Sequence, residues 1–102
     1  MSNITISEIL DDLRVADEIL RKFERRYWLA SAQFYELYSQ GRLDDGEHND
    51  DFAEWAGVYQ LKVRREEALR QLSEKRLSQL EQGRDGELIG LEPQEPNIEL
   101  SA

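Results

Sequence analysis

The aromatic residues of this 102-residue chain are confined to one part of it. Two Trp, four Tyr and three Phe all lie between Phe23 and Tyr59, and the segments on either side contain none. Because each aromatic side chain buries about 150–250 Å² when it packs, this segment predicts where the hydrophobic core lies. Within it, Trp55 is expected to pack against Tyr27 and Phe34. The core should therefore occupy one end of a small domain.

A long amphipathic helix is predicted for residues 6–28. Thr5 is followed three residues later by Glu8, a capping-box pattern that marks the start of a helix. Apolar residues then recur at alternating spacings of three and four, which keeps one stripe facing a partner helix. The stripe consists of Ile6, Ile9, Leu13, Ala16, Leu20, Phe23 and Tyr27.

A short second helix is predicted for residues 32–39. Its apolar side chains recur at helical spacing, Ser31 is the expected N-cap, and Gly41 is expected to end the helix in the left-handed conformation. About two turns of helix do not persist alone, so this element must be held against the longer helices.

A third helix is predicted for residues 51–82, after a loop rich in Gly, Asp, Asn and Glu. Asn49 or Asp50 is the expected cap. Gly57 costs roughly 1 kcal/mol relative to Ala in a helix, and close approach of another backbone is the expected reason for it. The helix is expected to continue through this residue.

Together these elements predict an all-α fold, an antiparallel helical hairpin of a long, a short and a long helix in a domain spanning residues 1–82. The third helix should be roughly 48 Å long and the first roughly 34 Å. The end of the third helix is therefore expected to project past Ile6. The leucines left without an intramolecular partner by that overhang would be Leu72, Leu77 and Leu80.

Residues 83–102 predict a flexible acidic tail. They contain five acidic residues and one basic residue, and their few apolar side chains are too sparse to form a core. Apolar groups in the tail and late in the third helix are instead candidates for contact with another protein. The predicted partner-binding residues are Leu69, Leu72, Leu77, Leu80, Leu88, Ile89, Leu91, Ile98 and Leu100.

The charge of the chain argues against nucleic acid as its main partner. Thirteen Lys and Arg residues against 22 Asp and Glu residues give a formal net charge of -9, which repels phosphate backbones. The basic residues of the long helices also alternate with acidic residues at spacings of three and four. That pattern predicts a solvated face with surface ion pairs rather than a basic stripe.

Composition also bears on where the protein works. There is no cysteine, which excludes disulfides and thiolate metal sites. The longest apolar run is far shorter than the roughly 20 residues that span a bilayer. The first residues lack the basic and apolar segments of a signal peptide. A cytoplasmic protein with no membrane association is expected.

His48 is the one histidine of the chain, and it lies among acidic loop residues. A solvated loop is favoured over a general base or a metal ligand, because the run from Asp44 to Asp51 lacks the glycine at the sixth position and the glutamate at the twelfth that a calcium loop needs, and no second histidine is available. No nucleophile or phosphate-binding glycine loop accompanies it. We therefore predict no catalytic residue, no metal and no cofactor. Trp28 and Tyr35 become candidate contact residues if they point outward.

The segment from Phe23 to about Arg65 resembles a family of small prokaryotic helical proteins that look like the antitoxin components of toxin–antitoxin pairs. The resemblance is carried by residues 23–27 (FERRY), 31–35 (SAQFY), 41–43 (GRL) and 51–56 (DFAEWA). It implies a small cytoplasmic protein that binds a toxic, nuclease-like partner encoded by a neighbouring gene. These are packing and loop residues, so the resemblance assigns no functional residue. The acidic loop and the segment after Gly83 do not match its pattern.

The sequence thus predicts a non-catalytic, antitoxin-like module that neutralises a cognate toxin, expected to be basic, by direct binding. A homodimer is also expected, because the apolar stripe of the first helix is regular and the third helix overhangs. The alternative function is a structural homodimerisation scaffold, for which the tail would be dispensable. An enzyme is the third interpretation, and it would need His48 turned into a pocket beside carboxylates.

Overall fold

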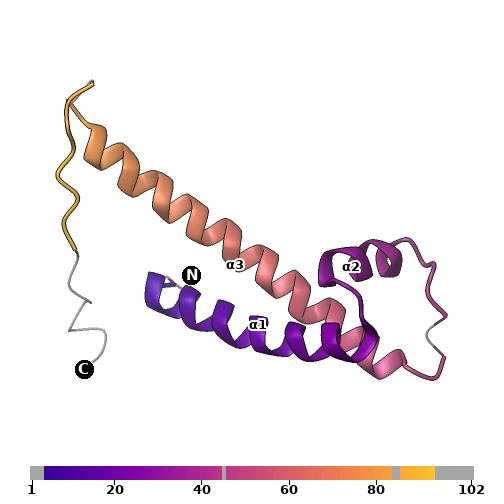
Figure 1. The fold of residues 1–102 in the computed structure, drawn as a ribbon. Helices are drawn as coiled ribbons and strands as arrows, with labels where there is room; N and C mark the ends of the chain where they lie inside the picture. The colour runs from indigo at the N-terminus through magenta and orange to yellow at the C-terminus, as the bar shows by residue number, and fades with distance from the viewer. Residues whose placement is uncertain (1–3, 45, 84–85, 94–102) are drawn as a thin grey trace.

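A computed structural model describes residues 4–44, 46–83 and 86–93 of the chain. It contains three helices and, within those residues, no strand (Figure 1). The helices are α1 (Ile6–Tyr27), α2 (Ser31–Ser39) and α3 (Asn49–Glu81). The predicted all-α fold with a long, a short and a long helix is confirmed. Residues 86–93 have no helix or strand, and the flexibility of the tail stays a prediction.

The helix α1 begins as its sequence predicts. The Thr5 hydroxyl accepts a hydrogen bond from the Glu8 backbone N–H (3.1 Å), and the Glu8 carboxylate accepts one from the Thr5 N–H (2.9 Å). This reciprocal pair satisfies two N–H groups that have no partner inside the helix. The apolar stripe is used inside the molecule, because four of its residues are buried. These are Ile9, Ala16, Leu20 and Phe23.

The helices α1 and α3 lie antiparallel, and ion pairs between them fix their register (Figure 1). These pairs are Arg26–Asp51 (3.3 Å), Lys62–Asp17 (3.9 Å) and Arg65–Asp12 (2.7 Å). In an antiparallel pair, each step back along α1 matches a step forward along α3. Ile9 is therefore level with Leu69, and Ile6 is level with Leu72. The acidic first half of α1 lies beside the basic middle of α3.

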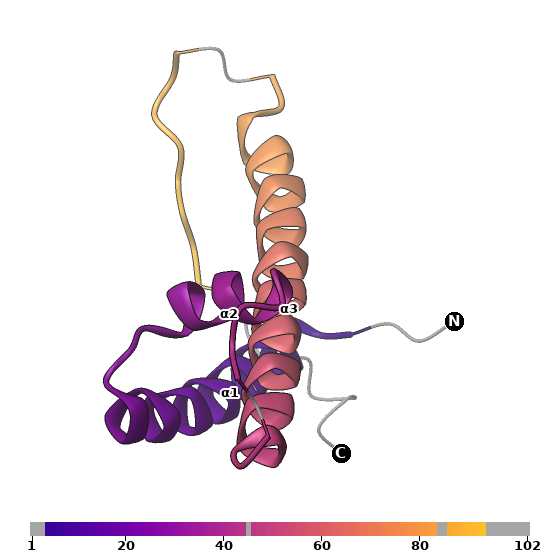
Figure 2. The ribbon, with the colours of Figure 1, turned by 90° about the vertical axis from the view of Figure 1, so that its right-hand side faces the viewer.

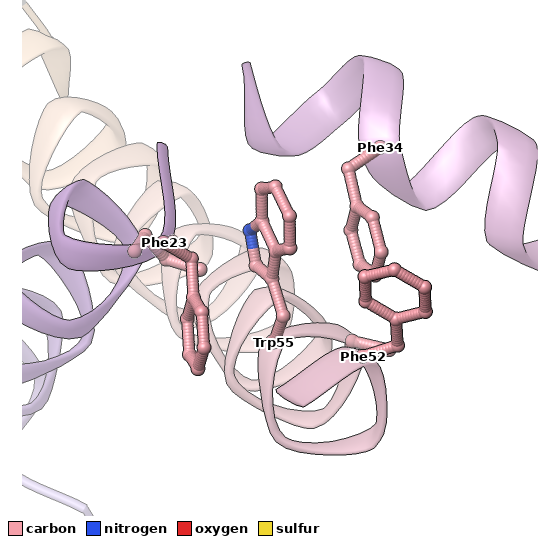
Figure 3. Close-up of a cluster of buried hydrophobic side chains, with 6 residues drawn as sticks. Phe23, Phe34, Phe52 and Trp55 are labelled. Atoms are coloured by element: carbon pink, nitrogen blue, oxygen red, sulfur yellow. The ribbon is translucent and has the colours of Figure 1, made fainter. Parts of the chain in front are cut away.

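The core lies at the end of the hairpin where α2 packs (Figure 3). Trp55 is 1% exposed and stacks on Phe34 with ring centroids 3.8 Å apart and an interplanar angle of 1°. Its ring also stacks on Phe23 at 5.5 Å and on Tyr27 at 5.6 Å. The predicted packing of Trp55 against Tyr27 and Phe34 is confirmed. One tryptophan from α3 thus joins rings from α1 and α2.

The start of α2 differs from the prediction. Ser31 is not the N-cap but the first residue of the helix, and Ala30 precedes it without a side-chain cap. The Glu24 carboxylate of α1 takes over the capping role, because it accepts hydrogen bonds from the Ser31 backbone N–H (3.0 Å) and hydroxyl (2.8 Å). The Ser31 oxygen in turn accepts a hydrogen bond from Trp55 Nε1 (2.9 Å). Ser31 therefore links all three helices.

The start of α3 also differs. His48 occupies the N-cap position without a side-chain hydrogen bond, so neither Asn49 nor Asp50 caps the helix as predicted. The Asp51 carboxylate is drawn to α1 instead and accepts a hydrogen bond from the Tyr27 hydroxyl (2.6 Å). That hydrogen bond, with some burial, raises the pKa of Tyr27 above its usual value. The first turn of α3 is therefore tied to α1 through Asp51 and has no side-chain cap of its own.

Two glycines have different roles. Gly41 has a φ of 67° directly after Gln40, the C-cap of α2, so it ends the helix as predicted. Gly57 lies inside α3, is exposed, and has no heavy atom within 4 Å of where a Cβ would stand. The expected close approach of another backbone at Gly57 is therefore wrong. The helix continues through it because a single glycine costs only about 1 kcal/mol.

Candidate interaction surface

The end of α3 farthest from α2, which we call the far end, projects past the start of α1 (Figure 2). From the register above, residues 73–81 extend beyond Ile6, a length of about 14 Å. Leu72 is level with Ile6 rather than beyond it, which shortens the predicted overhang. Among the described residues, no other helix lies beside these last turns.

The four predicted leucines of α3 do not form one stripe. Leu72 is 37% exposed and Leu77 is 50% exposed, whereas Leu69 and Leu80 are less exposed than either. Residues five positions apart on a helix are turned by about 140° from each other, so Leu72 and Leu77 lie on different faces. Leu77 lies past Ile6, where α1 begins, and is the most exposed of the four.

The predicted contact residues of the tail are placed in part. Leu88 is 98% exposed, Leu91 is 72% exposed and Ile89 is 38% exposed. Ile98 and Leu100 lie outside the described residues. The three apolar side chains that are placed face solvent within a short distance along the chain from the far end. Their exposure is compatible with contact to another surface.

Glu92 of the tail lies beside Arg76 of the far end. The Arg76 guanidinium donates a hydrogen bond to the Glu92 backbone oxygen (3.2 Å). An open depression of about 560 Å³ lies at the last turn of α3, and its lining is polar. The lining residues are Ser78, Gln79, Glu81 and Gln82. The far end therefore presents exposed apolar side chains next to polar and acidic ones.

Trp28 is an exposed aromatic residue at the opposite end. Its side chain is 91% exposed, and its backbone is left-handed, with a φ of 58° and a ψ of 44°. Its N–H donates to the Glu24 carbonyl (2.8 Å) and completes the last turn of α1. This backbone conformation costs a residue with a Cβ about 1–2 kcal/mol. Trp28 thus satisfies the condition under which the sequence made it a candidate contact residue.

Tyr35, the other conditional candidate, lines a groove between α2 and α3. The groove has a volume of about 310 Å³. Its lining residues are Tyr35, Tyr59, Gln60, Val63 and Arg64. The Tyr35 and Tyr59 rings lie 5.2 Å apart, and Gln60 Nε2 donates a hydrogen bond to the Tyr35 hydroxyl oxygen (2.6 Å). We call this feature the tyrosine groove.

Sequence reasoning did not find the tyrosine groove as a unit. The available signal was that the apolar stripe of α3 runs from Phe52 to Val63, whereas α2 has only nine residues to cover it. It also missed Glu24, which no local pattern distinguishes from the other acidic residues of α1. The Glu24 side chain is 21% exposed. Burial raises its pKa, but hydrogen bonds from Arg21 and Ser31 outweigh that effect, so the pKa lies below its usual value.

The basic residues of the long helices take part in surface ion pairs, as predicted. Arg70 bridges Glu67 and Glu74 along α3, and the hydrogen bond from Arg70 lowers the pKa of Glu67. Arg14 pairs with Glu18 at 3.4 Å along α1. Exposed pairs of this spacing contribute about 0.2–0.5 kcal/mol each. They form a solvated face.

His48 is exposed, and its ring lies against Tyr27 and Phe52 with centroids 5.8 and 6.2 Å away. In the part of the chain that the structure describes, no three His, Asp or Glu side chains come together as a metal site would require. Nor does any helix found there combine the length and apolar character needed to cross a bilayer.

Comparisons with protein-family models, with curated proteins and with solved structures found no match.

Proposed function

We propose that the protein is a non-catalytic, antitoxin-like binding module that neutralises a cognate basic protein by direct contact. The observation that carries the proposal is the far end of α3. There Leu77 is 50% exposed in the last turns of α3, which extend past both other described helices, and Leu88 and Leu91 are exposed in the adjoining tail. Exposed apolar groups clustered at one end of a small domain favour a protein contact.

Charge supports a basic partner. The chain has a formal net charge of -9, and the described tail residues Glu87 and Glu92 are exposed beside the apolar ones. Leucines would anchor the contact, while carboxylates would steer association and occupy cationic positions on the partner. For a nuclease-like partner, those positions are the ones that hold RNA phosphates. The module would therefore compete with the nucleic acid that its partner binds.

The non-catalytic part of the proposal rests on the surroundings of His48. The His48 ring is exposed and lies against Tyr27 and Phe52. It is thus not enclosed in a pocket beside carboxylates, which the enzyme interpretation needs. The cytoplasmic location remains part of the proposal and follows from the resemblance and the composition.

The alternative, a homodimerisation scaffold, has less support. The expected dimer contacts were the apolar stripe of α1 and the overhang of α3, but Ile9, Leu20 and Phe23 in that stripe are buried inside the single chain. A charge of -9 on each copy also opposes association. A scaffold with these contacts would therefore have to use the overhang of α3 alone.

The test compares full-length protein with protein truncated after Gln82. The binding partner in both cases is the product of the neighbouring gene. Circular dichroism first establishes that the truncated protein keeps its helicity. We expect truncation to lower the affinity for the partner and to weaken its dependence on salt, because the steering carboxylates are removed. Equal protection by the two proteins in a growth-rescue assay would count against neutralisation through the tail.

Two matched variants separate the roles within the tail. Replacing Leu88 and Leu91 by Ser removes apolar anchors and keeps every charge, so we expect faster dissociation with unchanged salt dependence. Replacing Glu87 and Glu92 by Gln keeps the anchors and should slow association at low salt. If neither pair of substitutions changes binding, the tail is not the contact surface.

A further inference from the structure

Trp28 has no packing role within its own chain. Its side chain is 91% exposed, and its left-handed backbone costs about 1–2 kcal/mol that a glycine would not cost. The indole is too exposed for burial within the chain to offset that cost. Trp55, by contrast, is 1% exposed and holds the three helices together. Trp28 is therefore an aromatic side chain available for contact outside the chain.

The tyrosine groove has the chemistry to receive an indole. Its walls are the tilted Tyr35 and Tyr59 rings, and Val63 is 45% exposed along it. Aromatic rings favour offset or edge-to-face contact with another ring, and the Arg64 guanidinium can lie over an indole face. The Tyr35 oxygen accepts one hydrogen bond from Gln60 and retains a second lone pair. The indole N–H can donate to that lone pair.

We infer that Trp28 of one copy docks into the tyrosine groove of a second copy. Both halves of the contact, an exposed indole and an aromatic groove that borders an arginine, are present on the same chain. This inference does not rest on the neutralising function proposed above. It also uses neither the stripe of α1 nor the leucines of the far end.

Local charge makes this approach of two acidic molecules favourable. The residues before Trp28 include the exposed Lys22 and Arg25, a basic stretch in a chain whose net charge is -9. The exposed Glu36 is next to Tyr35 in α2, whereas Glu67, about one turn after Arg64, is already paired with Arg70. Docking brings the basic stretch of one copy toward Glu36 of the other. The contact is attractive locally although the whole molecules repel each other.

The size of the contact predicts a weak dimer. A tryptophan buries roughly 150–250 Å² when it packs. A two-fold dimer makes the contact twice, and with both surfaces counted it buries less than about 1,000 Å². Stable interfaces bury about 1,200–2,000 Å². We expect a dimer that forms at high micromolar to millimolar protein and dissociates below that range.

The experiment uses the full chain and two measurements. Sedimentation equilibrium gives the mass as protein concentration rises, and neutral acrylamide quenches exposed tryptophan fluorescence. Because Trp55 is 1% exposed, the quenching reports on Trp28. We expect the mass to approach that of a dimer while the quenching falls in parallel. A monomer at every concentration, or a dimer in which quenching stays unchanged, would overturn the inference.

Three variants locate the contact. Trp28→Gly removes the indole and relieves the backbone cost, so we expect a monomer with an equal or higher thermal midpoint. Val63→Glu places a charge in the groove and should give a monomer with unchanged helicity. Leu77→Glu is the matched control, because Leu77 is 50% exposed on the same helix and lies outside the groove. It should dimerise like the natural protein.

The variants also exclude the competing surface. If Leu77→Glu abolishes the dimer and Val63→Glu keeps it, the far end joins the copies and the inference is wrong. Trp28→Gly and Val63→Glu leave the tail intact, so they should not affect neutralisation of a partner. Failure of the dimer and failure of the proposed function are thus separate outcomes.

Discussion

Two residues on α3 show how differently its two ends are built. Trp55, near the start of the helix, is 1% exposed and touches rings from α1 and α2. Leu77, about six turns later, is 50% exposed because it lies past Ile6, where α1 begins. The helix is continuous, so the difference comes from its neighbours. One helix can hold the fold together at one end and offer apolar side chains to another molecule at the other.

Polar interactions differ between the ends in the same way. The end of the hairpin where α2 packs on Trp55 is called the aromatic end. There Glu24, Ser31 and Trp55 form a chain of hydrogen bonds that water reaches poorly. Toward the far end, Arg70 pairs with Glu67 and Glu74 on an exposed face. An enclosed hydrogen bond to a charged group contributes about 1.5–3 kcal/mol, whereas a surface ion pair contributes about 0–1 kcal/mol. The aromatic end should therefore carry most of the stability.

The largest expected effect comes from removing Trp55. Trp55→Ala should destabilise the fold by about 3–5 kcal/mol, enough to unfold a domain of this size. Leu77→Ala, the control on the same helix, should change stability by less than about 0.5 kcal/mol. Urea unfolding followed by circular dichroism measures both. Similar losses from the two substitutions would contradict the difference between the ends.

The next effect comes from Glu24. Glu24→Gln should destabilise the fold by about 1–2 kcal/mol at neutral pH, because an uncharged amide replaces the carboxylate that Ser31 and Arg21 contact. The control is Glu18→Gln, since the Glu18 side chain is 68% exposed. It should have little effect. Thermal midpoints compare the variants.

The pH dependence of the same variant provides a second check. The pKa of Glu24 in the fold lies below its usual value of 4.5. Its stabilisation is therefore present above that unfolded value and is lost as the pH falls through the lower folded value. We expect the difference between Glu24→Gln and the natural protein to shrink on acidification below 4.5. A constant difference would show that the ionised carboxylate is not the stabilising species.

Local features of the fold could be predicted from the sequence. The Thr5–Glu8 capping box and the end of α2 at Gly41 depend on neighbouring residues alone, and both are confirmed. Ser31 and Asp51 could not be assigned in that way. Their partners, Glu24 and Tyr27, come from another helix, so their roles exist only after the helices pack.

The candidate surface shows the same limit. The sequence identified leucines near the end of the third helix, but which of Leu72 and Leu77 lies past Ile6 follows only from the register of α1 against α3. The tyrosine groove depends on how far α2 covers α3, which no local pattern gives. Trp28 was identified as a contact residue only on the condition that it points outward. The left-handed end of α1 fulfils that condition.

A smaller effect is expected at Gly57, on the exposed side of α3. Gly57→Ala should stabilise the fold by about 0.5–1 kcal/mol, because alanine favours helix and its Cβ meets no neighbouring atom. Gly41→Ala is the opposite control, since its φ of 67° disfavours a side chain. The thermal midpoint of the Gly41→Ala protein should fall. If Gly57→Ala also lowers the midpoint, α3 is not a regular helix at that residue.

The smallest effect is expected from the ion pair between Asp12 and Arg65, which joins α1 to α3 away from the aromatic core. The Asp12 and Arg65 side chains are 41% and 30% exposed, and their closest atoms are 2.7 Å apart. Solvent screens such a pair, so a double-mutant cycle with Asp12→Asn and Arg65→Gln should give a coupling of about 0.2–1 kcal/mol. Molar salt should reduce it further, because the Debye length then falls to about 3 Å. A coupling as large as the effect of Glu24→Gln and insensitive to salt would mean that this half of the hairpin is also closed to water. The contrast between an enclosed end and a solvated end would then fail.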